Sequence, residues 1–145
     1  MTHKALFLWV TLTLAGAPLS ASGEEKEKGK VQVDVSKIPP PAKVKGATYE
    51  KDIKPIFDQS CVKCHGEQKP KGKLQLTNLP AILKGGEDGK VVDPGNSASS
   101  VLVHNIAHVG DPDDYMPPPH NKAGIGPLTT EQIGLIRAWI DEGAK

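Results

Sequence analysis

Apolar side chains recur at helical spacing most clearly near the end of the chain, which predicts a helix with one buried face. The stripe consists of Ile133, Ile136, Trp139 and Ile140. Thr129 is expected to be the N-cap of this helix, because Gln132 follows three residues later and completes a capping box. Gly143 is a natural terminator.

Three shorter segments earlier in the chain show the same periodicity. The first begins at Thr48, which we expect to be an N-cap because acidic residues follow at Glu50 and Asp52. Its apolar face comprises Ile53, Ile56, Phe57 and Cys61. Pro55 has to lie in or near the first turn of this helix, since a proline deeper inside would kink it.

Two further helices are predicted between these. One covers residues 78–84 and ends at the pair of glycines that follows. The other is capped by Ser97 or Ser99. Its apolar residues are Val101, Leu102, Ile106 and Ala107. No segment is typical of a hairpin or of alternating strands and helices, so residues 48–145 are predicted to form one all-α domain.

The first 23 residues follow the order of parts that is typical of a secretory signal peptide. Lys4 supplies the positive charge, an apolar run covers residues 5–17, and small residues end the segment, with cleavage expected after Ala21 or Gly23. The run is shorter than the roughly twenty residues of a membrane-spanning helix. We therefore expect residues 1–23 to be a signal peptide and the rest of the chain to be periplasmic.

Residues 24–47 are predicted to be a charged, proline-rich linker. The stretch 24–30 is almost entirely charged, and such a composition cannot bury enough apolar surface to offset the entropy lost on ordering. Three prolines at 39–41 predict a short, stiff spacer. The alternating valines at 31, 33 and 35 are compatible with a short edge strand.

Composition narrows the classes of function. The chain carries 18 Lys or Arg and 17 Asp or Glu, and one lysine lies in the predicted signal peptide, so the remainder is neutral. That balance excludes a dedicated nucleic-acid-binding domain. Aromatic residues make up only 4% of the chain, and a core this poor in aromatics often depends on a metal, disulfides or a cofactor. Two cysteines exclude a dense disulfide scaffold.

The pentapeptide 61–65 is C-x-x-C-H, the attachment signal for c-type haem. Two thiols three positions apart near a helix end can add to the two vinyl groups of one porphyrin. The histidine that follows is then placed beneath the iron as its proximal ligand. We therefore predict one covalent haem c, bound through Cys61 and Cys64, with His65 on the iron.

Two other interpretations of the cysteines stay open. A redox C-x-x-C site would need a thioredoxin-like frame of strands and helices, which the pattern does not show. A zinc site could add His104 and His108, but 39 residues separate Cys64 from His104. The usual spacing in such zinc sites is about twelve to fifteen.

Met116 is the only methionine outside the predicted signal peptide. It precedes three prolines at 117–119, a stiff loop that can hold a thioether in a fixed position and is a poor place for a core residue. A thioether can complete the coordination of haem iron opposite a histidine. We therefore predict Met116 as the distal ligand, with His104, His108 and His120 as the alternatives.

These motifs together resemble a class I cytochrome c domain, of the planctomycete type, over residues 48–145. The matching stretches are 52–57, 61–66, 71–74, 92–95, 100–102, 116–118 and 135–144. The resemblance implies a small single-haem fold in which the N- and C-terminal helices cross around the covalent haem. It also implies that Phe57 and Trp139 are the packing aromatics of the first and last helix.

A haem with both axial positions filled has no open site for a substrate. The predicted function is therefore that of a periplasmic single-haem electron carrier, and not of an enzyme. One alternative is a haem-based ligand sensor in which Met116 leaves the iron. Another is a redox module docked to a larger enzyme or membrane complex.

The expected partners are redox proteins that the sequence does not identify. We expect a monomer that binds no nucleic acid and meets a membrane only through a partner or an uncleaved signal. Two charged groups could steer docking. They are Lys63, Lys69, Lys71 and Lys73 on one side and Asp111, Asp113 and Asp114 on the other. Arg137 and the nearby lysines are candidate donors to the haem propionates.

Overall fold

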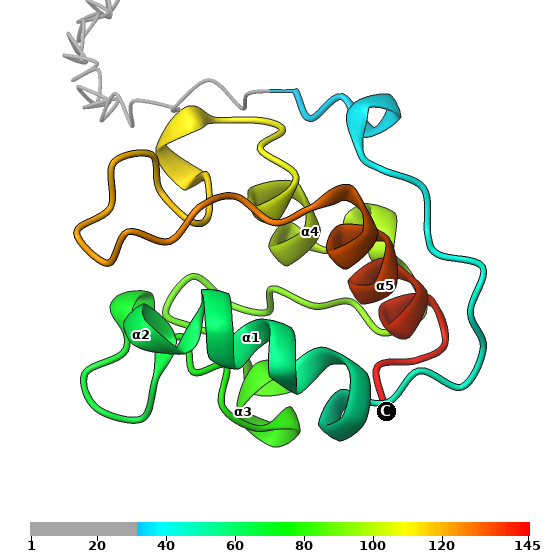
Figure 1. Cartoon of the computed structure of the whole chain (residues 1–145), viewed down its shortest axis with the longest axis horizontal. Coiled ribbons are helices and arrows are strands. Elements are labelled where there is room, and N and C mark those ends of the chain that lie inside the picture. Colours follow the sequence, from blue (N-terminus) through cyan, green and yellow to red (C-terminus); the bar gives the residue numbers. More distant parts are fainter. Residues whose placement is uncertain (1–31) are drawn as a thin grey trace, which may run out of the picture. The chain divides into compact units, whose positions relative to one another are not determined.

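The computed structural model describes residues 32–145. The predicted signal peptide at 1–23 and the first part of the predicted linker lie outside this range. Five α-helices and several single turns build the described part, which contains no strand and only one isolated bridge, between Gly86 and Gly89 (Figure 1). The α-helices are α1 Lys54–Ser60, α2 Val62–His65, α3 Leu79–Lys84, α4 Val101–Ile106 and α5 Thr130–Asp141. The prediction of an all-α class is confirmed.

The last helix, α5, forms as its sequence predicts. Thr129 Oγ1 accepts the Gln132 N–H at 3.2 Å and Gln132 Oε1 accepts the Thr129 N–H at 2.9 Å, so the capping box is complete. The predicted apolar stripe is buried in full. Gly143 follows the helix with a φ of +98°, a left-handed conformation that glycine adopts without strain.

The first helix begins after Thr48 with Glu50 and Asp52 in its first turn, as predicted, but it lacks the predicted side-chain cap. It starts as a π-helical turn, η2 (Tyr49–Ile53), which continues directly into α1. The Thr48 side chain caps nothing; instead Asp52 Oδ2 accepts the Thr48 N–H at 2.8 Å. Pro55 lies in the first turn of α1, as expected.

Helix α3 is confirmed, and α4 needs one correction. Asn78 Oδ1 accepts the Ala81 N–H at 2.9 Å and caps α3. Neither Ser97 nor Ser99 caps α4, because these residues form a separate 3₁₀ turn, η4 (Ser97–Ser99). The reason is tertiary: Ser97 donates its N–H and its hydroxyl to the Asp141 carboxylate, at 2.8 and 3.0 Å.

Aromatic side chains join the two ends of the domain in its core. The ring centroid of Tyr49 lies 6.3 Å from that of Phe57 and 6.1 Å from that of Trp139, and all three side chains are fully buried. Lys145 strengthens this junction, because its backbone oxygen accepts the Tyr49 N–H at 2.8 Å and the Trp139 indole N–H at 2.9 Å. Phe57 and Trp139 are therefore core residues.

Residues 32–47 are not a free linker, which corrects that part of the predicted boundary. Ile38 is 5% exposed and belongs to the core cluster. The Ala42 N–H donates to the Gly134 carbonyl of α5 at 2.8 Å, and the Arg137 guanidinium donates to the Pro39 carbonyl. This arm runs beside α5 before it enters η2 (Figure 1).

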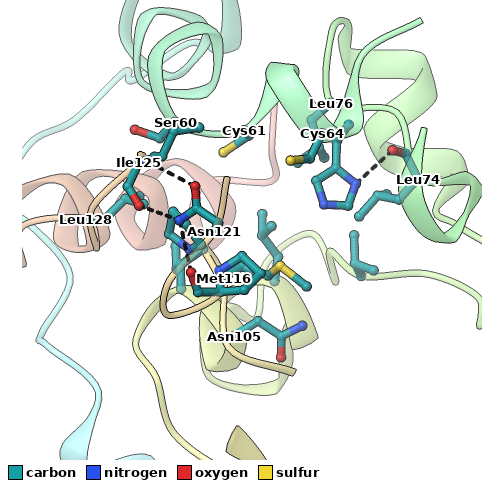
Figure 2. A pocket seen from close by; sticks show the side chains of 16 residues that line it. Ser60, Cys61, Cys64, Leu74, Leu76, Asn105, Met116, Asn121, Ile125 and Leu128 are labelled. Carbon is teal, nitrogen blue, oxygen red and sulfur yellow. Dashed lines mark hydrogen bonds between the residues drawn. The ribbon is translucent and has the colours of Figure 1, made fainter. Parts of the chain in front are cut away.

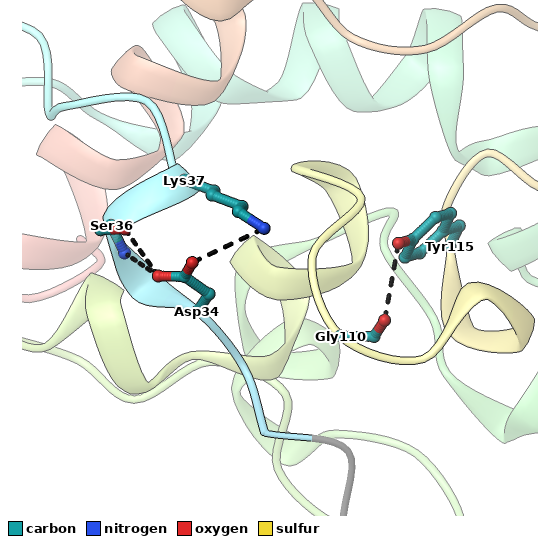
Figure 3. Close-up of polar contacts among 5 residues, drawn as sticks. All are labelled: Asp34, Ser36, Lys37, Gly110 and Tyr115. Atoms are coloured by element: carbon teal, nitrogen blue, oxygen red, sulfur yellow. Dashed lines mark hydrogen bonds and ion pairs between the residues drawn. The ribbon is translucent and has the colours of Figure 1, made fainter.

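Gly134 permits this close approach of the arm. A Cβ atom at Gly134 would lie 3.0 Å from the Pro40 carbonyl oxygen. In the described part of that segment, from residue 32 on, the compatible edge strand does not form either: Val35–Lys37 make a 3₁₀ turn, η1, whose N-cap Asp34 accepts the Ser36 N–H at Oδ1, at 3.2 Å (Figure 3). In the described part of the chain, no helix combines the length and the apolar character needed to cross a membrane.

Replacing Ile38 should reveal the docked arm. We expect Ile38→Ala to lower the free energy of unfolding by about 2–5 kcal/mol, because it removes buried methyl groups and leaves a cavity. Val35→Ala is the matched control in the same arm, since Val35 is 54% exposed and its replacement should change stability by about 0.5 kcal/mol or less. Urea unfolding of the haem-loaded protein measures both. Equal effects of the two substitutions would show that the arm does not pack on the core.

Candidate functional site

Four of the predicted site residues line the same cavity. It lies between α2, α4 and the loop that follows η5 (Pro112–Asp114), and its space, counted together with the solvent at its open side, is about 650 Å³. Sixteen side chains line it, most of them apolar (Figure 2). Cys61, Cys64, His65 and Met116 are all among them. A mostly apolar hollow with a few convergent functional groups is the usual form of a cofactor site.

The two cysteines are brought together by a helical turn. Cys61 is the residue between α1 and α2, and its carbonyl oxygen accepts the N–H of Cys64 at 3.0 Å and of His65 at 2.9 Å. Both thiols are free and half-buried in the cavity wall. Two effects raise the pKa of Cys61 to about 12: the larger is burial, and the smaller is the charge of the nearby Cys64. A thiol of this kind is the opposite of the low-pKa thiolate that a redox C-x-x-C site uses.

The His65 imidazole is oriented by a backbone carbonyl. Its Nδ1 lies 3.1 Å from the Leu74 oxygen, and because a carbonyl can only accept, Nδ1 carries the proton. Nε2 is left with its lone pair, as a metal-ligating histidine requires. Burial lowers the pKa of His65, which favours the neutral ring. Sequence reasoning missed Leu74 in this role, since a backbone acceptor leaves no signature in the sequence.

Met116 reaches the cavity from the other side. Figure 2 shows its thioether across the cavity from Cys61 and Cys64. Its backbone N–H donates to the Asn105 carbonyl of α4 at 3.0 Å, and its side chain packs against the core cluster. The proline-stiffened loop therefore places the side chain of Met116 in the wall of the cavity.

Asn121 clasps the loop that carries Met116. Its Nδ2 donates to the carbonyls of Pro118 at 2.9 Å and Ile125 at 2.7 Å, and its Oδ1 accepts the Ile125 N–H at 3.1 Å. The dashed lines in Figure 2 mark these bonds. One half-buried side chain thus joins the two segments of the loop, at Pro118 and at Ile125. The sequence offered only a weak signal for it, an asparagine in a turn-rich stretch.

The alternative distal histidines do not line the cavity. His104 Nε2 lies 2.7 Å from the Ala98 oxygen, and the exposed His120 is in a left-handed turn. The His108 ring stacks on Tyr115 with centroids 4.7 Å apart. The Tyr115 hydroxyl in turn donates to the Gly110 carbonyl at 3.5 Å (Figure 3).

The candidate propionate donor Arg137 and the candidate zinc ligand His104 also lie outside the cavity. Arg137 donates to Ser97 Oγ at 3.0 Å and to the arm, so it is committed to the fold and does not line the cavity. The zinc alternative needs His104 near the cysteines, and His104 is bound to Ala98 instead. Within residues 32–145 no three His, Cys, Asp or Glu side chains are grouped as metal ligands.

The donor set fits a covalently attached haem. Two thiols one turn apart lie beside an imidazole with a free Nε2, and a thioether faces them across an apolar space. Thiols suit bonds to vinyl groups, while imidazole and thioether are the pair of iron ligands found in cytochromes c.

Comparison with known proteins gives one finding. Residues 61–120 match the family model described as Planctomycete cytochrome C. The match covers both cysteines, His65 and Met116, and the family implies a covalent haem c. No curated protein and no solved structure matches the chain significantly.

Removing the thiols should remove the covalent bonds. We expect the double variant Cys61→Ser/Cys64→Ser to lose the mass of one haem under denaturing conditions, because a hydroxyl does not form the thioether. Each single variant should keep that mass but shift the pyridine haemochrome band to longer wavelength, since one vinyl group stays conjugated. Ser60→Ala, another cavity residue, is the control and should behave as the wild type. A haem adduct in the double variant would contradict the assignment.

Proposed function

We propose that this chain, which contains a planctomycete-type cytochrome c domain, is a single-haem electron carrier whose iron is bound by His65 and Met116. One observation carries the proposal. Both residues line the same apolar cavity as the two cysteines. A c-type cytochrome function in electron transfer follows from the family, and the ligand pair is our assignment.

Each residue has a definite task in this proposal. The Cys61 and Cys64 sulfurs hold the haem covalently, so it is retained in both oxidation states. His65 offers Nε2, with the ring held at Nδ1 by the Leu74 carbonyl at 3.1 Å. Met116 offers its thioether, held by the loop that Asn121 clasps. When bound, the haem supplies a one-electron couple at its iron.

The ligand pair and the apolar walls set the direction of the reduction potential. A thioether is a soft ligand that favours ferrous over ferric iron, and Met/His ligation raises the potential of a cytochrome. The lining of the cavity is dominated by side chains such as Leu76, Leu102 and Leu128. Such walls disfavour the more highly charged ferric state.

We also propose the helix arrangement of class I cytochromes, with the first and last helices crossing beside the haem. Support comes from the junction of η2 with the end of α5, where Tyr49 packs between Phe57 and Trp139. Ile53 is fully buried at the same junction. These contacts bring the two ends of the domain together behind the cavity.

The proposed place of work is the periplasm, where c-type haem is attached. The support is the signal-like segment at 1–23, together with a domain whose cysteines suit that attachment. The partners would be redox proteins that exchange electrons at the haem edge. Both proposed axial positions are filled, which favours a carrier over an enzyme or a ligand sensor.

A substitution of Met116 distinguishes the proposed electron carrier from a haem-based ligand sensor. Met116→Leu keeps the volume of the side chain and removes the sulfur. We expect it to abolish the weak charge-transfer band of ferric haem at the red end of the spectrum. The reduction potential should fall, and carbon monoxide should bind the ferrous variant rapidly. Ile125→Val, a change of another lining residue, should leave all three properties near those of the wild type.

The wild type itself provides the decisive comparison. Carbon monoxide should bind it slowly, because the stiff loop loses little entropy in holding sulfur on iron. Rapid binding by the wild type at neutral pH, or the absence of its sulfur band, would contradict the carrier proposal in favour of a sensor.

Asn121 should control how firmly Met116 is held. Asn121→Asp is isosteric but replaces a double donor by an acceptor that faces the carbonyls of Pro118 and Ile125. Lost bonds to half-buried carbonyls cost about 1–3 kcal/mol, so the loop should open more often and carbon monoxide should bind at least several times faster.

A matched control separates this effect from added negative charge. Asn96→Asp places the same change at an exposed cap, where the Oδ1 acceptor that binds the Ser99 N–H is kept. Its rate of carbon monoxide binding should equal that of the wild type. Equal rates for Asn121→Asp and Asn96→Asp, measured by stopped flow, would remove Asn121 from this role.

A further inference from the structure

A second hollow, open to solvent, adjoins the haem cavity, and its space, counted together with that solvent, is about 1000 Å³. The two spaces share His65, Leu74, Val91, Asn105 and Met116. The cysteines line only the first cavity. The hollow therefore extends from the proposed axial residues without reaching the sites of covalent attachment.

Because haem is asymmetric, the position of the hollow relative to the cysteines indicates which part of a bound haem would face it. The two vinyl groups, which form the thioethers, and the two propionates lie on opposite edges of the porphyrin ring. If Cys61 and Cys64 hold one edge inside the first cavity, the opposite edge faces away from them. The hollow meets both axial residues and lacks the cysteines, so a haem held in this way would direct its propionates toward it.

Two chain segments form one wall of the hollow, and the backbone locks them together. The Glu87 N–H donates to the Gly72 carbonyl at 2.8 Å, and Lys73 pairs with Glu87 at 3.6 Å. A Cβ atom at Gly86 would lie 2.6 Å from the Gly72 oxygen, so the segments approach as closely as they do only because Gly86 has none. This contact holds Lys71 and Lys90 on the same hollow.

The cations of the hollow are available to bind an anion. Within residues 32–145, Lys71 and Lys90 form no ion pair, whereas Glu87 is paired with Lys73. Asp88 and Asp114, which likewise form no ion pair among residues 32–145, are the remaining charged residues of the lining, so its two unpaired lysines and two unpaired carboxylates balance in charge. Asn105 adds an amide, for which the described residues provide no hydrogen-bond partner, at the boundary of the two spaces.

We infer that Lys71 and Lys90 bind the two haem propionates, with the Asn105 amide as a neutral donor beside them. The inference rests on the proposed function, since it needs a haem held by Cys61 and Cys64. Ammonium–carboxylate hydrogen bonds are charge-assisted and stronger than neutral ones. They would also place positive charge near the iron, which favours the ferrous state and raises the reduction potential.

Neutralising each lysine tests the inference by two measurements. In Lys71→Gln and Lys90→Gln the propionate-bending band of the resonance Raman spectrum should shift, because the carboxylate loses a charged donor. The reduction potential should fall in each variant and fall further in the double variant. Lys71→Arg and Lys90→Arg keep the charge and the donors, so they should restore the wild-type potential.

Lys45→Gln is the control for a change of net charge. Lys45 is exposed and lines neither space. The Lys45→Gln variant should leave the Raman band unchanged. Its small effect on the reduction potential should vanish near 1 M salt, where the screening length is about 3 Å. The effect of a bound lysine should persist at that salt.

The outcomes separate this inference from the proposed function. A wild type without covalent haem would overturn both. A normal wild type whose Raman band stays unmoved in a lysine variant would overturn the assignment of that lysine alone. A fall in potential no larger than that of Lys45→Gln would do the same.

Discussion

The extended segment 74–76 is the connection on which the site depends. Its backbone binds the C-x-x-C-H motif twice: the Leu74 oxygen accepts from His65 Nδ1 at 3.1 Å, and the Leu76 N–H donates to the His65 carbonyl at 2.9 Å. The Leu76 oxygen then accepts the hydroxyl of the buried Tyr49 at 3.1 Å. The position of the imidazole is thus fixed by the same backbone that is bonded to the aromatic core.

Much of the fold could be predicted because its signals are local. The capping box at Thr129 and the Asn78 cap each depend on residues three positions apart, so the sequence itself contains the whole interaction. The docking of residues 32–47 could not be predicted in this way. It depends on the missing Cβ of Gly134 and on Arg137, about 95 residues further along the chain, and neither has a periodic pattern that indicates it.

The candidate site also has one part that the sequence predicts and one part that it does not. Its chemical groups, Cys61, Cys64, His65 and Met116, could be predicted because each residue type suits one task in haem binding, and the structure brings all four to one cavity. Their supports could not. The Leu74 and Asn105 carbonyls belong to the backbone, which any residue supplies, and Asn121 acts through bonds that exist only once the loop has closed.

The two sides of the cavity are supported unequally, which bears on how such a carrier responds to stress. On the cysteine side, His65 belongs to a helix and is bonded to segment 74–76 through both its ring and its carbonyl. On the other side, Met116 lies in a loop tied to α4 by a single backbone bond and closed on itself by Asn121. Local opening takes the path with fewest bonds to break. The Met116 loop should therefore open first, and in the proposed haem-bound state the bonds from Cys61, Cys64 and His65 would keep the haem in place and allow the Met116 sulfur to return.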